Sequence, residues 1–423
     1  MGHAGGSCRH DGSNLSTTVE RHRAAPHLCR IALAAIVASM AFAIVAASTH
    51  GAPFTPSDDS QVLERLPAAS NTEARTLRRL HAALSQTPNQ LDLALRVAQR
   101  DMELGRAEAD PRYNGYAEAA LAPWWSLENP PIPVLLMRAT LRQSRHDFRG
   151  ALDDLSHVTS VDRDNAQAWL TRATILQVQG DYAQADESCR ALLGLARPLI
   201  AATCTNSVAS LNGHALDSYR DLRRVFEREA ATAGVQIRLW ALTVLAEMAA
   251  RLGDDHTAEA HFGQAFSLGL RDAYLLGAYA DFLLDHQRAA EVRDLLRDQV
   301  RIDPLLLRLA LAERLLAAPE CAAHIAELRE RFANSRARGD TTHRREEARF
   351  SLHLLNEPER ALQLAEANWF VQREPWDTRL LLEAALAARM YARAAPVLDW
   401  LTATRLEDAQ VRRLVEELGR RQQ

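Results

Sequence analysis

A fixed interval in the residue numbering organises the middle of this chain. Residues of the same kind return 34 positions later in two consecutive stretches, and the pairs are Asp147 and Asp181, Phe148 and Tyr182, Ala139 and Ala173, and Ala151 and Ala185. A fixed interval of this length is typical of arrays of small structural units, which grow by adding units and not by enlarging one core. The length of 423 residues therefore does not require two or three separate domains.

Each stretch has the pattern of two helices joined by a tight turn. Apolar residues at helical spacing, such as Leu135 and Ala139, come first and are followed by a short polar break with an aspartate. Aspartate caps the start of a helix, and alanines let two antiparallel helices approach closely. One helix pair leaves an apolar face bare, so we expect neighbouring pairs to stack and cover it.

The composition fits an all-α fold. Hydrophobic residues make up 47% of the chain but aromatic residues only 6%, and we find no hairpin signature or long alternating β-branched run. The net charge of −4 does not indicate binding to nucleic acid or to an anionic membrane.

The two stretches resemble the tetratricopeptide repeat, a helix–turn–helix family of 34-residue units. The unit at residues 166–199 carries the resemblance best, and the unit at 132–165 has His146 where the family has glycine and lacks its final proline. The residues that define the repeat are Ala139, Phe148, Ala151, Trp169, Ala173, Gly180, Tyr182 and Ala185, with Asp147 and Pro198 in support. The resemblance implies a right-handed α-solenoid of stacked antiparallel helix pairs.

Weaker units extend the array in both directions. Ala246, Gly253 and Ala258 have matching offsets, and Ala395 follows Ala361 at the same interval. Further pairs are expected to turn at Gly213 and at Pro319, with cap helices at residues 73–87 and 403–420. The array is expected to cover residues 73–420, after a flexible spacer at residues 49–72.

The N-terminus has the pattern of an export signal. Arg21, Arg23 and Arg30 precede the uncharged run IALAAIVASMAFAIVAA at residues 31–47, which small and polar residues follow. We interpret residues 1–48 as a cleaved signal peptide or, if it is not cleaved, a signal anchor. The rest of the chain is then periplasmic, free or held at the inner membrane through that segment alone.

Cys189 and Cys204 fall on helices that are expected to be consecutive. Since export permits disulfides, they either form a disulfide or remain as two buried thiols.

No linear motif for catalysis, phosphate binding or metal binding is present in the chain. The acidic and histidine-containing stretch DDHTAEAH, with Asp254, Asp255, His256 and His261, is explained by helix capping better than by a metal site. We expect no cofactor, no metal and no enzymatic activity; the alternative is a metal-handling or enzymatic protein whose site lies between repeats.

Residues 329–349 are locally basic, with seven arginines against four acidic residues. This stretch either binds an acidic partner or membrane head groups, or is a solvated helix end and loop.

The resemblance implies a protein–protein interaction scaffold that binds a peptide or protein, here an envelope component, on its concave face. No nucleic acid is expected as a partner. In the two best units the concave face would present Thr140, Gln143, Ser144, Thr174 and Gln177, which are uncharged and polar. Such a groove would bind extended backbone through hydrogen bonds.

Overall fold

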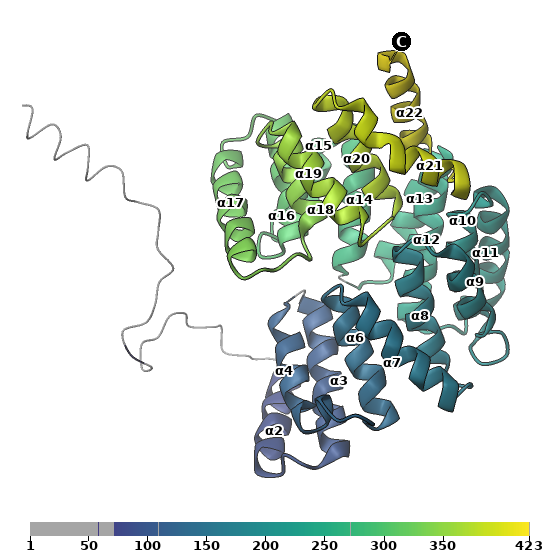
Figure 1. Ribbon diagram of the computed structural model, residues 1–423, viewed down its shortest axis with the longest axis vertical. Coiled ribbons are helices and arrows are strands. Elements are labelled where there is room, and N and C mark those ends of the chain that lie inside the picture. Colours follow the sequence, from purple (N-terminus) through teal and green to yellow (C-terminus); the bar gives the residue numbers. More distant parts are fainter. Residues whose placement is uncertain (1–57, 59–71, 109, 271, 423) are drawn as a thin grey trace, which may run out of the picture. The chain divides into compact units, whose positions relative to one another are not determined.

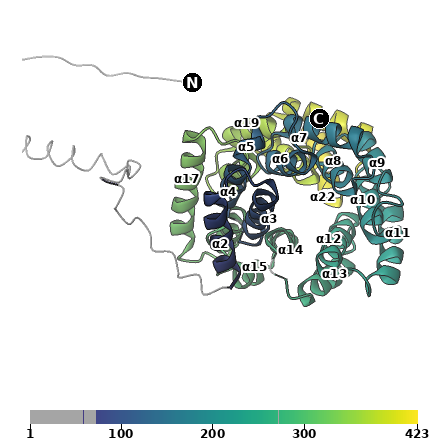
Figure 2. The ribbon, with the colours of Figure 1, turned by 90° about the horizontal axis from the view of Figure 1, so that it is seen from below.

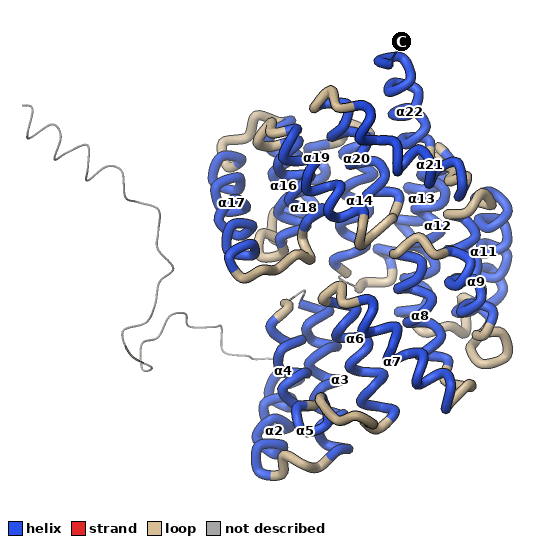
Figure 3. The backbone as a smooth tube through the Cα atoms, in the orientation of Figure 1, coloured by secondary structure: helices blue, strands red, loops and turns tan. Residues whose placement is uncertain are grey.

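The structure is a computed structural model that describes residue 58 and residues 72–108, 110–270 and 272–422. Within those ranges Figure 3 shows helices and loops and no strand, which confirms the predicted all-α fold. The predicted signal segment at residues 1–48 lies outside the described residues, as does the spacer apart from Asp58 and Thr72. All of the described helices belong to one unit, Ser70–Gln423.

The described helices follow one another as antiparallel pairs joined by short turns (Figure 1). The first helix of a pair packs against its partner and against the first helix of the next pair, for example α6 on α7 and α8. Their bounds are α2 (Thr72–Gln86), α3 (Leu91–Glu108), α4 (Arg112–Ala120), α5 (Ala122–Trp125), α6 (Ile132–Ser144), α7 (Phe148–Val161), α8 (Ala166–Val178), α9 (Tyr182–Arg190), α10 (Pro198–Ser210), α11 (Ala215–Glu229), α12 (Val235–Leu252), α13 (Asp255–Ser267), α14 (Ala273–Asp285), α15 (Ala289–Leu296), α16 (Asp303–Leu315), α17 (Cys321–Ala337), α18 (Arg344–His353), α19 (Pro358–Trp369), α20 (Pro375–Ala387), η1 (Tyr391–Ala394), α21 (Ala395–Thr404) and α22 (Ala409–Gln422).

The turn inside each pair from α6/α7 to α20/η1 contains one residue in the left-handed backbone conformation, which ends the first helix. Where the next residue is aspartate, its carboxylate accepts a hydrogen bond from a main-chain N–H group in the following helix, as Asp181 does from Gln184 at 3.2 Å. The left-handed residues are Gly180, Gly213 and Gly253, and also His146, Gln287, Ala317, Asn356 and Arg389. His146 therefore takes the conformation that glycine takes in the next unit.

Small side chains fill the crossing points of the helices. Ala139 and Ala151 are fully buried in one cluster with Phe148. Ala173 and Ala185 are buried in the next cluster with Tyr182. Because alanine has no atom beyond Cβ, the two helices of a pair lie close enough for the aromatic ring to close the end of the interface.

A disulfide joins two consecutive pairs. Cys189 on α9 is bonded to Cys204 on α10, with an S–S distance of 1.98 Å. Both residues are buried in the cluster that contains Ala173 and Tyr182, so the bond crosses the interface between one pair and the next.

A second set of contacts joins segments that are far apart in the chain. The Arg373 N–H group, between α19 and α20, donates a hydrogen bond to the Val178 carbonyl oxygen at 2.8 Å. The Glu407 carboxylate accepts the N–H group of Ala215, the first residue of α11, at 2.6 Å. In a simple array each pair contacts only its neighbours. Here the C-terminal helices close over the turns of α8/α9 and α10/α11, and we call these the closing contacts.

The closing contacts depend on the glycine in the α8/α9 turn. Gly180 has φ +77°, and a Cβ there would lie 3.1 Å from both the Arg373 Cβ and the Trp400 Nε1. The Trp400 ring packs beside Tyr182, with ring centroids 6.0 Å apart. Gly180 therefore serves two purposes, since it ends α8 and leaves room for the C-terminal segment.

None of the described helices is long and apolar enough to cross a membrane. The apolar run at residues 31–47 lies outside the described residues.

We expect Gly180→Val to destabilise the protein by about 1–3 kcal/mol, because valine is strained at positive φ and contacts the C-terminal segment. Ala317→Gly changes another left-handed turn residue, which is exposed and has φ +50°. It is expected to stabilise the protein slightly, by up to about 1 kcal/mol, because glycine adopts this conformation freely. Chemical denaturation of both variants measures the difference, and destabilisation by both would contradict the assignment of the turns.

Candidate functional site

The helices enclose a central cavity with a volume of about 1680 Å³. Its lining comes mainly from the first helix of each pair, from α3 and α6 through α20, and from the loop at residues 338–343. Figure 2 shows α12 and α14 on the inner side of the array and α11 and α17 on its outer side. The cavity is larger than the roughly 300–1,000 Å³ that is usual for small-molecule pockets.

All five residues that the sequence predicted for a partner-binding groove line this cavity. The Thr140 and Thr174 hydroxyls donate to carbonyl oxygens of their own helices, each at 3.0 Å. The Gln143 and Gln177 side-chain amides have no hydrogen-bond partner among the described residues. We call this surface the amide wall, and it consists of Thr140, Gln143, Ser144, Thr174 and Gln177.

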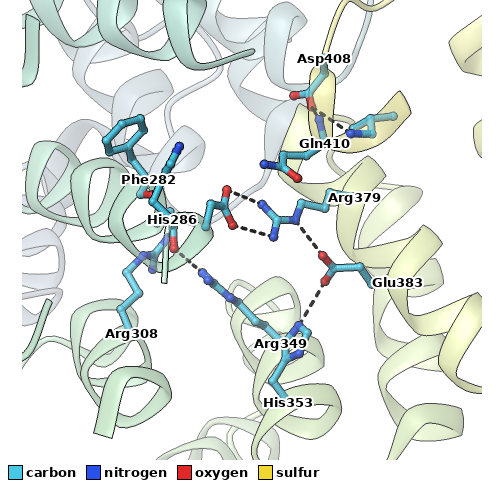
Figure 4. A network of polar contacts seen from close by, with 12 residues as sticks. Phe282, His286, Arg308, Arg349, His353, Arg379, Glu383, Asp408 and Gln410 are labelled. Atoms are coloured by element: carbon cyan, nitrogen blue, oxygen red, sulfur yellow. Dashed lines mark hydrogen bonds and ion pairs between the residues drawn. The ribbon is translucent and has the colours of Figure 1, made fainter. Parts of the chain in front are cut away.

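A second part of the lining is strongly charged, and we call it the charged wall: Asp281, Asp285, Arg308, Arg349 and Arg379. Figure 4 shows its three arginines converging on one region from α16, α18 and α20. Asp281 on α14 is buried and accepts bonds from Arg308 at 2.5 Å and from Arg349 at 2.6 Å. Burial alone would raise the pKa of the Asp281 carboxyl, but the two guanidinium groups outweigh it and hold that pKa below its ordinary value.

Arg379 continues the charged wall. It makes two hydrogen bonds to Asp285, at 2.7 and 2.8 Å, and a third to Glu383. The Trp376 ring packs against the guanidinium groups of Arg349 and Arg379, with distances of 4.5 and 4.4 Å to the ring centroid. These cation–π contacts hold both guanidinium groups in place.

Glu247 and Tyr274 form a hydrogen-bonded pair on α12 and α14. The Tyr274 hydroxyl donates to the Glu247 carboxylate at 2.8 Å, and Tyr274 is 63% exposed within the cavity lining. Burial of Glu247 among the surrounding helices raises the pKa of its carboxyl to about 7, against the opposing effects of the Tyr274 hydrogen bond and Arg251.

The 34-residue interval relates the residues of the lining to one another. It separates Glu247 from Asp281 and Arg345 from Arg379, and each of these residues lines the cavity from the first helix of its pair. The same interval separates the turns at His146 and Gly180, both of which have left-handed backbones. The described part of the chain is thus a solenoid of helix pairs, of the tetratricopeptide-like fold class that its sequence predicted.

No family model matches the chain, and no curated protein matches it. Solved structures of tetratricopeptide-repeat proteins are similar to it at low identity. A tetratricopeptide repeat protein from Parabacteroides merdae is 16% identical, with 60% of this chain and 90% of that chain covered and a TM-score of 0.40. A Rap protein complexed with competence and sporulation factor is 13% identical, with 82% and 97% covered and a TM-score of 0.44.

The residues of the DDHTAEAH stretch do not come together in this tetratricopeptide-type array. Asp254 caps α13 by accepting the Thr257 N–H group, and Asp255 pairs at 2.9 Å with His286, the residue that follows α14. His261 is buried and its Nε2 lies 3.0 Å from the Tyr219 hydroxyl. Within the described ranges, no group of three or more His, Cys, Asp or Glu residues is arranged to hold a metal ion.

Most of the arginines in the basic stretch at residues 329–349 are engaged in ion pairs. Arg345 bonds to Glu374 and Asp377, and Arg349 bonds to Asp281. Arg331 and Arg336 are paired in the same way, with Asp303 and Glu347. The stretch is therefore largely a part of the packing between repeats.

We expect Asp281→Asn to destabilise the protein by about 3–5 kcal/mol, because it leaves two buried guanidinium groups without their counter-charge. Asp294→Asn is the matched control, since its pair with Arg297 is more than half exposed, and it is expected to cost less than about 0.5 kcal/mol. Urea denaturation of both variants compares the two losses. Equal losses would show that the charged wall is not a buried network.

We expect Glu247→Gln to change how stability depends on pH. The pKa of Glu247 is about 7 in the folded protein and near 4.5 in the unfolded chain. The folded state therefore holds the proton more tightly, and wild-type stability falls as pH rises from 4.5 through 7. Glutamine removes this fall. The melting temperature of the variant, relative to that of the wild type, should therefore rise between about pH 5 and pH 8. A difference that stays constant with pH would contradict the raised pKa.

Proposed function

We propose that this protein is a non-catalytic scaffold that binds a peptide or protein segment in its central cavity. The observation that carries the proposal is a cavity of about 1680 Å³ with unpartnered side-chain amides on one wall and an ordered charged network on another. A cavity of that size and polarity suits an extended polypeptide better than a small apolar molecule.

The amide wall provides general recognition of polypeptide backbone. Gln143 and Gln177 are separated by one repeat interval and lie at equivalent positions on α6 and α8. The two amides are therefore one helix pair apart along the lining. A side-chain amide can both donate to a carbonyl oxygen and accept from an N–H group. This arrangement supports binding with modest dependence on the sequence of the partner.

We further propose that the scaffold works in the bacterial cell envelope, on an envelope component. The basic residues and the apolar run at residues 21–47 favour export. The buried disulfide between Cys189 and Cys204 also supports this location, because such bonds persist in oxidising compartments and are rare in the cytosol.

Photo-crosslinking followed by an affinity measurement tests the proposal. A photoreactive residue placed at Gln177, in the cavity, should capture a partner from native envelopes that can be identified by mass spectrometry. The same residue at Gln236, which is exposed and outside the cavity lining, is the control position. Equal capture at both positions would contradict binding in the cavity.

The purified partner then allows a direct test of the amide wall. Changing Thr140, Gln143, Thr174 and Gln177 together to alanine should weaken binding about tenfold or more, because several hydrogen bonds are lost. The matched control changes two threonines and two glutamines that are exposed and outside the cavity lining: Thr87, Gln236, Gln264 and Thr402. Unchanged affinity in the first variant would rule out the amide wall.

A further inference from the structure

Three exposed arginines in the cavity lining form no ion pair within the described residues, and we call them the arginine rim: Arg106, Arg301 and Arg338. Arg106 lies near the end of α3, Arg301 lies just before α16, and Arg338 follows the last residue of α17. They differ from the arginines of the charged wall, which carboxylates hold in place.

The members of the rim belong to one part of the lining. The Asp110 N–H group donates to the carbonyl oxygen of Gly105, the residue before Arg106, at 2.9 Å. Arg112, and more weakly Arg301, lower the pKa of the Asp110 carboxyl, so Arg301 lies within electrostatic reach of this segment. Arg331 donates to the Arg301 carbonyl oxygen at 3.4 Å and lies on α17, two helical turns before Arg338.

The carboxylates in this part of the cavity are already engaged. Asp110 bonds to Arg112 at 2.6 Å, Asp303 bonds to Arg331 at 2.6 Å, and Asp340 accepts the Thr342 N–H group at 2.9 Å. Arg112 is paired with Asp110, and Arg331 is paired with both Asp303 and Glu327. The three rim arginines therefore outnumber the two remaining carboxylates of this region, those of Asp340 and Glu346. This part of the lining is therefore positively charged, although the whole chain has a net charge of −4.

We propose that the arginine rim binds an acidic segment of the partner polypeptide, an inference that rests on the proposed function and adds the charge of the ligand. A free guanidinium group binds carboxylate through two parallel N–H···O bonds. Three such groups from three segments can each take one carboxylate of the same chain, and the only bond to be exchanged within the described residues is the 3.3 Å hydrogen bond from Arg338 to the Ser335 hydroxyl. Because the rim faces a concave lining, it suits a polypeptide that enters the cavity and not the flat surface of a bilayer. The negative charge of the whole chain also disfavours long polyanions such as nucleic acid.

Fluorescence anisotropy with the full-length protein tests this inference. The probes are a short labelled peptide in which glutamates alternate with glycine and serine, and the same peptide with glutamine in place of glutamate. Replacing the three rim arginines with glutamine (R106Q, R301Q and R338Q) should weaken binding of the acidic peptide about tenfold. It should also reduce the dependence of that binding on salt.

The matched control replaces Arg149, Arg329 and Arg413, which are exposed, have no ion pair within the described residues and lie outside the cavity lining. That control should leave binding within about twofold of the wild type.

Three results would overturn the inference. Equal binding of the glutamine peptide, with no effect of the rim variant, would remove the charge preference but leave binding in the cavity standing. Failure of both peptides to bind would remove the rim as a ligand site, while the crosslink at Gln177 decides the proposed function separately. Loss of sedimentation with phosphatidylglycerol vesicles in the rim variant, without loss of peptide binding, would assign the rim to a membrane.

Discussion

The closing contacts are the constraint on which the rest of the structure depends. The Arg373 N–H group and the Glu407 carboxylate bond to the turns of α8/α9 and α10/α11, and Trp400 and Leu406 pack against the cluster that contains the disulfide. Without these contacts the array would present an open groove, in which each helix pair contacts only its neighbours. With them, the first helices of the pairs enclose a cavity. Gly180 matters for this reason, because its missing side chain both ends α8 and leaves room for the segment that closes the array.

A cavity that is lined by so many charges is stable only if those charges are paired. The chain has 50 basic residues and every one is arginine, whose planar group can bind two or three acceptors at once. Arg379 binds Asp285 and Glu383 at once, and Asp281 accepts from both Arg308 and Arg349, so these bonds join helices from different pairs. Asp281, Asp285 and Glu383 together balance the three arginines of the charged wall. The amide wall and the arginine rim have no such ion pairs among the described residues, and they are the surfaces that we propose for ligand binding.

The repeat was predictable because each unit carries its own local signals. Aspartate caps, small residues at crossings and a turn residue at each repeat interval are properties of short stretches, and the five residues of the amide wall followed from the same register. The closing contacts were not predictable in this way, since Arg373 and Val178 lie far apart in the chain and neither repeats a pattern. The charged wall falls between these cases. Glu247 and Asp281, and Arg345 and Arg379, are each one repeat interval apart, so the interval also carries a signal for charged inner positions outside the two best units.

Residue-resolved hydrogen exchange of two amides tests the central claim, that the array is closed on itself. The Ala215 amide is at the first position of α11 and has no acceptor in its own helix; its bond is to Glu407. The Arg373 amide lies in a loop and bonds only to Val178. The closed structure predicts that both amides exchange as slowly as those inside neighbouring helices. Exchange of both at the rate of an exposed loop, while α8 and α12 stay protected, would show an open solenoid and contradict the account.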